Sequence, residues 1–167
     1  MEISIQLLDT ILFFYFLVIA FAVPFLDAQT ILPSNIFPDI LVQFKTWFTY
    51  EFGNYLLAER PHFFIGIAWL ELLLAWPLSI ASIYGIAAAK SWLPITCLLY
   101  GVYFFTALVA ILFELVGSGK ASQKLLLFYF TFLGFAILSI LRGFLPLSSK
   151  LKVVSERPRR LVTKKRA

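Results

Sequence analysis

Four long apolar stretches constrain this chain more than any other feature. They cover about residues 7–26, 63–89, 92–116 and 125–145. A helix needs about 20 largely apolar residues to cross roughly 30 Å of hydrocarbon, and each stretch meets that length. A bilayer interior offers no water to the backbone N–H and C=O groups, so all four stretches are expected to be helices. The sequence therefore predicts an all-α membrane protein, a bundle of four transmembrane helices.

Composition excludes a soluble domain of the same length. The chain is 61% hydrophobic and 14% charged, whereas soluble domains are about half apolar and about a quarter charged. Lipid must therefore cover part of the surface. The single cysteine, Cys97, cannot support a disulfide framework and is expected to be a small buried side chain. The first stretch is not expected to be a cleaved signal peptide, because its start lacks Lys and Arg and carries Asp9.

The basic residues are distributed unevenly, and this predicts the orientation. Four spans place both termini on one side, together with the short loop that holds Lys90. The segment from Arg142 onward holds nine of the 14 basic residues, which are Arg142, Lys150, Lys152, Arg157, Arg159, Arg160, Lys164, Lys165 and Arg166. The opposite side has Lys45, Arg60, Lys120 and Lys124. An excess of ten over four predicts cytosolic termini.

The domain organisation that follows is a membrane domain over residues 1–147 and a basic cytosolic tail over residues 148–167. Anionic membrane lipids are expected partners of the tail. Nucleic acid is not, because no folded surface for reading bases accompanies the basic cluster. Lys164 and Lys165 stand at the fourth and third positions from the end. Such a pair resembles the dilysine signal that retrieves membrane proteins to the endoplasmic reticulum, although a basic tail also contains lysine pairs by chance.

Two carboxylates in or beside the spans are the main candidates for function. Asp27 closes the first stretch, and Glu71 lies about eight residues, or roughly 12 Å, into the second. The first stretch runs outward and the second returns, so both acids are expected near the lumenal side. Two carboxylates close together in a low dielectric cannot both stay charged cheaply, so one is expected to hold a proton. Such a pair holds an amine by charge or a hydroxyl by hydrogen bonds. Two plainer interpretations stay open: a helix cap for Asp27, and a protonated helix-to-helix hydrogen bond for Glu71.

Other polar positions carry weaker signals. Pro77 removes a backbone hydrogen bond in the second span and predicts a kink near Glu71. Glu114 and His62 are expected at the membrane interface. A lone histidine without cysteine or histidine partners predicts no metal site.

The first loop is predicted to contain one or two short lumenal helices that cover the mouth of the bundle. Pro38 and Asp39 suit the start of a helix. Aromatic and aliphatic residues then recur every three or four positions, at Phe37, Leu41, Phe44, Phe48 and Phe52.

Three segments carry a resemblance to a known family. They are Phe25-Leu26-Asp27-Ala28-Gln29-Thr30-Ile31-Leu32-Pro33, Tyr50-Glu51-Phe52-Gly53-Asn54-Tyr55-Leu56-Leu57, and Glu71-Leu72 with Pro77 six positions on. Over nearly the whole chain the pattern resembles the sigma-2 receptor (transmembrane protein 97) family. This family belongs to the wider EXPERA group, which includes the emopamil-binding protein, a sterol isomerase. The Asp-x-Gln-x-x-x-Pro block is fairly specific, whereas the Glu-to-Pro spacing alone is weak.

The resemblance implies an intramembrane pocket for sterols or lipophilic amines, and a homodimer. Carried over, Asp27 pairs with a ligand amine, Glu71 is its hydrogen-bonded companion, and Thr106 and Tyr129 line the pocket. Two positions depart from the family pattern. Asn54 stands where the receptor has an aspartate. Ile67 stands where the isomerase arrangement has a histidine, so the proton shuttle for double-bond migration is missing.

The function expected from these features is a non-enzymatic, cofactor-free membrane protein of the endoplasmic reticulum. It would bind sterols and lipophilic amines and take part in sterol or cholesterol homeostasis or trafficking. The first alternative is a sterol isomerase that uses Glu71 and Asp27 as acid and base. The second is a small transporter or proton-coupled carrier.

Overall fold

The computed structural model describes residues 2–155, with side chains for residues 4–145, and every regular element in that range is helical. In chain order the elements are α1 (Glu2–Phe25), η1 (Asp27–Thr30), η2 (Ser34–Ile36), α2 (Asp39–Phe52), α3 (Tyr55–Glu59), α4 (His62–Leu70), η3 (Glu71–Ala75), α5 (Trp76–Ala87), α6 (Leu93–Ser118) and α7 (Gln123–Ser155).

The prediction of four membrane-spanning helices is confirmed. The segments long and apolar enough to cross a bilayer are Ser4–Thr30, His62–Ala87, Leu93–Ser118 and Gln123–Leu145. The second span consists of α4, η3 and α5 end to end. Helix α7 continues through Ser155, past the predicted boundary after residue 147. The division into a membrane domain and a tail stays a prediction, and Lys164 and Lys165 lie outside the described residues.

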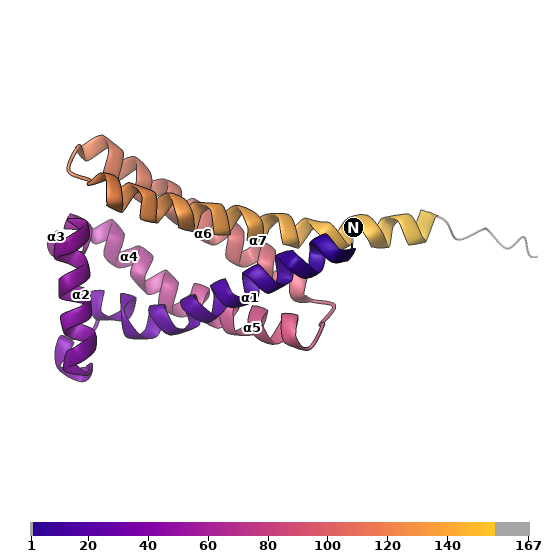
Figure 1. Ribbon diagram of the computed structural model, residues 1–167, viewed down its shortest axis with the longest axis horizontal. Helices are drawn as coiled ribbons and strands as arrows, with labels where there is room; N and C mark the ends of the chain where they lie inside the picture. Colours follow the sequence, from indigo (N-terminus) through magenta and orange to yellow (C-terminus); the bar gives the residue numbers. More distant parts are fainter. Residues whose placement is uncertain (1, 156–167) are drawn as a thin grey trace, which may run out of the picture.

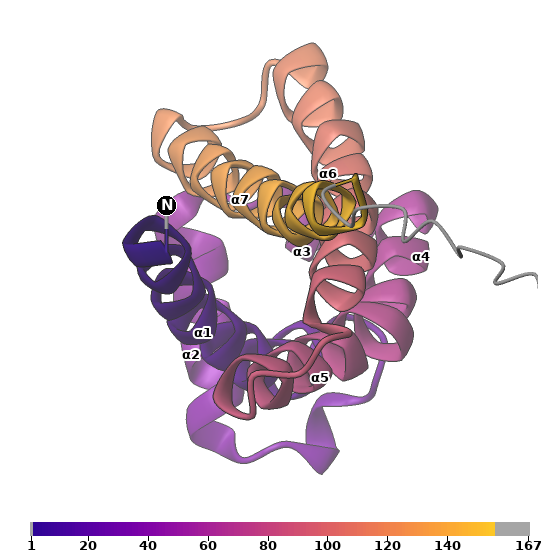
Figure 2. The same cartoon turned by 90° about the vertical axis from the view of Figure 1, so that its right-hand side faces the viewer.

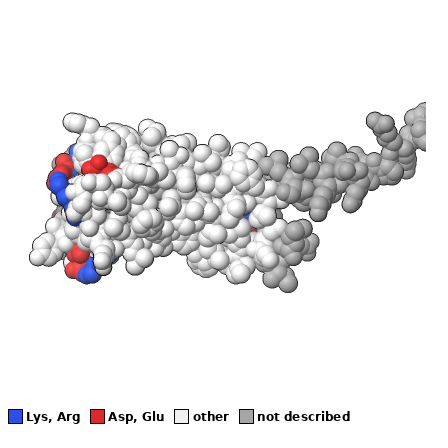
Figure 3. All heavy atoms as spheres, turned by 90° about the horizontal axis from the view of Figure 1, so that it is seen from above, with Lys and Arg blue, Asp and Glu red and all other residues white. Residues whose placement is uncertain are grey.

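The long helices run side by side, and α2 and α3 lie across one end of them (Figure 1). Seen along the bundle, the α6–α7 pair faces the α1–α5 pair (Figure 2). The start of α2 at Asp39, directly after Pro38, confirms the predicted helix over the mouth of the bundle. On the face seen in Figure 3, charged side chains gather at the end that carries α2 and α3, and the middle of the bundle is almost free of them.

Helices α6 and α7 form the closest pair in the bundle because glycine stands at their contact. A Cβ built on Gly101 would lie 2.8 Å from the backbone nitrogen of Ile140 and 2.9 Å from the carbonyl oxygen of Ala136. A Cβ on Gly143 would lie 3.0 Å from the carbonyl oxygen of Pro94. Small residues let membrane helices approach backbone to backbone, where dispersion forces hold them together. These two glycines therefore determine the spacing of the α6–α7 pair.

Aromatic side chains connect this pair to α1. The hydroxyls of Tyr15 in α1 and Tyr100 in α6 lie 2.7 Å apart and are buried. The Tyr15 ring stacks on Phe135 of α7 with centroids 4.5 Å apart, and Phe16 meets Tyr100 edge-on at 5.0 Å. Such pairs add to the energy of area burial alone. The cluster joins three of the four spans.

The predicted irregularity before Pro77 takes the form of a π-helical turn. In η3 the backbone N–H of Trp76 donates to the carbonyl of Glu71, five residues earlier. Pro77 has no N–H and cannot continue the α-helical ladder, which explains a local change of pitch here. Single π turns inside helices often occur at functional sites. This turn begins at Glu71, the acid that the sequence singles out.

One membrane-embedded ion pair was not predicted. Arg142 of α7 donates from Nε to Oδ1 of Asp9 in α1, and from Nη2 to Oδ2 at 3.1 Å. Both side chains are largely buried, with 10% of Arg142 and 22% of Asp9 exposed. Asp9 neutralises Arg142, so this arginine is no longer part of the basic excess that orients the chain. Nine basic residues against four still favour the same orientation.

Candidate functional site

A cavity of about 300 Å³ lies inside the bundle at the end covered by α2. This volume is at the lower end of the range for small-molecule sites. Its walls are mainly apolar side chains of α1, α6 and α7, with aromatic rings from Phe104, Phe128 and Phe132. Its polar lining residues are Asp27, Lys45, Asn54, Glu71, Tyr100 and Tyr129. The cavity therefore has a mostly apolar lining with a few polar groups.

Asp27 and Glu71 both line this cavity, as the sequence predicted from their depth. Asp27 begins η1, just beyond the end of α1, and Glu71 begins the π-helical turn η3. Within the part of the chain that the structure describes, neither carboxylate forms an ion pair or hydrogen bond with another side chain. The two acids are thus free to accept from a ligand, which favours a binding role over a helix cap or a helix-to-helix hydrogen bond.

Tyr129 of α7 also lines the cavity and is buried. Asn54, between α2 and α3, donates from Nδ2 to the Tyr129 hydroxyl at 3.4 Å. Asn54 is only 2% exposed, and its Oδ1 has no hydrogen-bond partner among the described residues. An unpaired buried acceptor costs about 1–3 kcal/mol. A ligand hydroxyl donated to Asn54 Oδ1 would remove that cost.

Lys45 is the cavity residue that sequence reasoning missed. In the sequence it was only one of four basic residues on the side opposite the termini, but its half-buried side chain lines the cavity and donates to Thr30 Oγ1 at 3.0 Å. Burial, together with the nearby Arg60 guanidinium, lowers the pKa of Lys45 to about 8, and Asp27 opposes that change. Its helical spacing from Leu41 and Phe48, three or four residues away along α2, was the available signal.

Thr106 does not line the cavity, so this prediction is wrong. Its side chain is exposed on the outer face of α6, and its hydroxyl donates to the Val102 carbonyl of the same helix at 2.9 Å. A threonine that bonds its own helix needs no partner in a site. Phe104 and Leu108, one helical turn apart on the inner face of α6, line the cavity instead.

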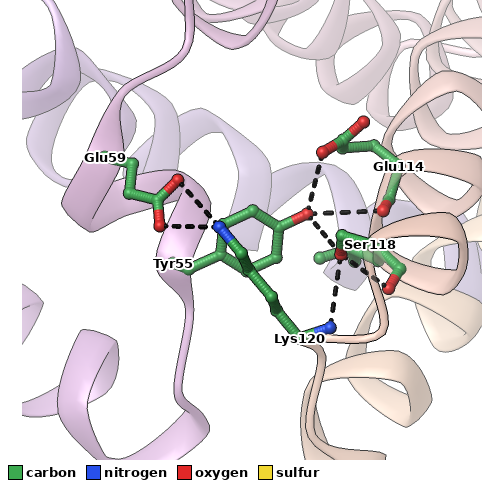
Figure 4. Close-up of polar contacts among 6 residues, drawn as sticks. Tyr55, Glu59, Glu114, Ser118 and Lys120 are labelled. Carbon is green, nitrogen blue, oxygen red and sulfur yellow. Dashed lines mark hydrogen bonds and ion pairs between the residues drawn. The ribbon is translucent and has the colours of Figure 1, made fainter.

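The remaining candidates lie apart from the cavity. His62 is exposed at the start of α4. Glu114, near the end of α6, is exposed and lies 3.1 Å from the Tyr55 hydroxyl, which joins α3 to α6 (Figure 4). In the described range, no three His, Cys, Asp or Glu side chains gather in a way that could hold a metal ion.

Fold and site together define a class of protein: a four-span helical membrane protein with an acid-lined, mostly apolar cavity within the bundle. The family model for EXPERA, the expanded EBP superfamily, matches residues 40–143 of this sequence. The chain belongs to the EXPERA family. The matched region runs from the first turn of α2 into α7 and contains Lys45, Asn54, Glu71 and Tyr129 of the cavity.

Relatives point to one branch of that family. The chain is 27% identical to sigma intracellular receptor 2 of Xenopus tropicalis over 113 residues, which are 67% of this chain and 66% of the frog protein. It is 29% identical to the proteins of the same name in Homo sapiens and Macaca fascicularis over 89 residues, or 53% of this chain. The matches thus span just under two thirds of the frog protein and 51% of each primate protein.

Proposed function

We propose that this protein binds sterols in the intramembrane cavity, accepts lipophilic amines as a second class of ligand, and serves sterol homeostasis or trafficking in the endoplasmic reticulum. The observation that carries the proposal is the polar lining of the cavity. Asp27 and Glu71 have no side-chain partner, and Asn54 Oδ1 no hydrogen-bond partner, among the residues that the structure describes, and all three are set among apolar walls. A sterol has the complementary chemistry, a large apolar body with one hydroxyl.

The two ligand classes would use the acceptors differently. A sterol hydroxyl has one proton to donate, and Asn54 Oδ1 and the carboxylates compete for it. A protonated amine carries a charge that an ionised carboxylate attracts strongly in a cavity shielded from water. The relatives named receptors support a binding role at this site.

A sterol isomerase is the second candidate, and family membership favours it in general terms. Double-bond migration needs a proton donor and a base at the substrate. The cavity offers Asp27 and Glu71, but no histidine among the described residues lines it. At position 67, where the isomerase arrangement has a histidine, this chain has an isoleucine whose backbone carbonyl accepts from the Tyr103 hydroxyl at 3.4 Å. The arrangement therefore supports binding better than catalysis.

The test uses purified protein in neutral phosphatidylcholine nanodiscs and a tritiated sterol, competed by a panel of sterols and lipophilic amines. The matched variants are Glu71→Gln, at the cavity, and Glu114→Gln, at the exposed end of α6. We expect saturable sterol binding that Glu71→Gln weakens and Glu114→Gln leaves unchanged.

Two results would count against the proposal. Absence of saturable binding in folded protein would contradict the sterol function. Conversion of a Δ8 sterol by the wild-type protein, lost in Glu71→Gln, would establish the isomerase in place of a simple binder.

A further inference from the structure

The four basic residues at the α2/α3 end fall into two pairs with different surroundings. Lys120 Nζ lies 3.0 Å from Glu59 Oε1 (Figure 4), and Lys124 Nζ lies 2.7 Å from Glu51 Oε1. Lys45 and Arg60 have no carboxylate within ion-pair distance among the described side chains. The unpaired members are the two that share a groove.

This groove, with a volume of about 700 Å³, lies along α2 and α3 beside the cavity, and Lys45 and Asn54 line both spaces. Ser34 also lines the groove, whereas the Thr46 and Thr49 hydroxyls donate to the Val42 and Lys45 carbonyls of their own helix. Among the described residues, no Asp or Glu lines the groove. The groove is therefore an open, water-accessible recess whose formal charge is positive.

Lys45 and Arg60 are close enough for their charges to repel each other. Arg60 lowers the pKa of Lys45, in addition to the effect of burial. Two like charges held together near a low-dielectric surface repel, and a bound anion relieves that repulsion. The chain even holds Arg60 at a left-handed φ of 50°, at the end of α3, where glycine is favoured.

We propose that the groove along α2 and α3 binds a phosphate group through Lys45 and Arg60. Guanidinium and ammonium groups are the usual partners of phosphate oxygens in proteins, and guanidinium binds them in a fork. The groove lies along α2 and α3, at the end of the bundle where charged side chains gather (Figure 3). A phospholipid headgroup and free phosphate offer the same chemistry, and the experiment separates them.

The experiment places full-length protein in phosphatidylcholine nanodiscs that contain a trace of spin-labelled phosphatidic acid or spin-labelled phosphatidylcholine. Electron paramagnetic resonance measures the immobilised fraction of each label, and inorganic phosphate is added as competitor. We expect wild type to immobilise the phosphatidic acid preferentially. The double variant Lys45→Gln/Arg60→Gln should lose roughly fivefold in affinity per cation, whereas Lys120→Gln/Lys124→Gln should retain the preference. Lys45→Arg, which keeps the charge, should also retain it.

The outcomes decide the proposal and its source of phosphate. Competition by millimolar inorganic phosphate would identify free phosphate as a ligand, and resistance to it would identify the lipid headgroup. Equal loss in the two double variants would show that binding follows overall surface charge, and the groove would not be a site. No preference in wild type would also overturn the proposal. Neither result bears on sterol binding, because the tritiated sterol assay is independent of the anionic probe.

Discussion

Substitutions of Asp27 and Glu71 are expected to weaken amine binding to different extents, although both residues line one cavity. Asp27→Asn keeps the shape of the side chain and removes its charge, so an amine ligand loses its counter-ion. Truncating one partner of a buried charge pair costs about 2–5 kcal/mol, which is a loss of roughly thirtyfold or more in affinity. If Asp27 carries the charge that pairs with the amine, Glu71→Gln removes only a hydrogen-bonded companion and should cost less. Competition binding with a lipophilic amine and a neutral sterol measures both.

A neutral sterol serves as the internal control, because it has no charge to lose. Its affinity should fall less than that of the amine in Asp27→Asn. Amine affinity that survives both substitutions in folded protein would contradict the pairing and leave the two acids with a structural role.

Substitution of Asn54 is expected to affect sterol affinity and the free energy of unfolding in different ways. Asn54→Val removes an orphaned acceptor, whose burial costs about 1–3 kcal/mol, and one hydrogen bond to Tyr129 worth about 0.5–1.5 kcal/mol. The free energy of unfolding should therefore stay the same or rise, whereas affinity for a hydroxylated sterol should fall. Thermal unfolding and sterol binding, measured on the same preparation, check the two directions. Lower stability with unchanged sterol affinity would show that Asn54 serves the fold alone.

At the scale of helices, the α6–α7 contact is where small changes matter most. Gly101→Ala places a methyl group 2.8 Å from the backbone of α7, and overpacking of this kind typically costs about 1–3 kcal/mol. Gly134→Ala, in α7 with no atom within 4 Å of the added methyl, is the matched control and should be neutral. Denaturation in mixed micelles measures both. Equal stability of the two variants would mean that α6 and α7 adjust their spacing freely.

Helix α2 and the π turn act together as elements of the site. The amphipathic period of α2 places Phe44, Lys45 and Phe48 over the cavity, and η3 places Glu71 beneath them. Helix α2 contributes little packing area, because none of its residues is fully buried. Such an element is suited to move when a ligand enters, since few buried contacts hold it in place.

For the whole molecule, the basic excess predicts that both termini face the cytosol and that α2 faces the lumen. Cys97 is fully buried, so the native chain is an unlabelled background for cysteine probes. In sealed microsomes, a membrane-impermeant maleimide should label the Ala167→Cys variant. It should label the Tyr50→Cys variant, whose position is exposed on α2, only after permeabilisation. The reverse pattern of labelling would contradict the orientation.

The sequence alone determined the features that depend on average hydropathy and on local chemistry. Four long apolar runs require four helices because a bilayer leaves backbone groups no other partner. Pro38 and Asp39 mark the start of α2, Pro77 requires a break in the second span, and Asp27 and Glu71 are expensive enough at that depth to be candidates for a site.

Tertiary structure alone decided which way each helix turns. A helix rotates about 100° per residue, and in a span apolar on all sides no polar stripe shows which face meets the other helices. Thr106 therefore faces outward although a resemblance placed it in the pocket, and Lys45 lines the cavity although it lies in the loop between the first two spans. The Asp9–Arg142 pair joins residues 133 positions apart, a contact that only the packing of α1 against α7 creates. Hydropathy acts on whole segments, whereas a site depends on the rotation of each helix, and close packing determines that rotation.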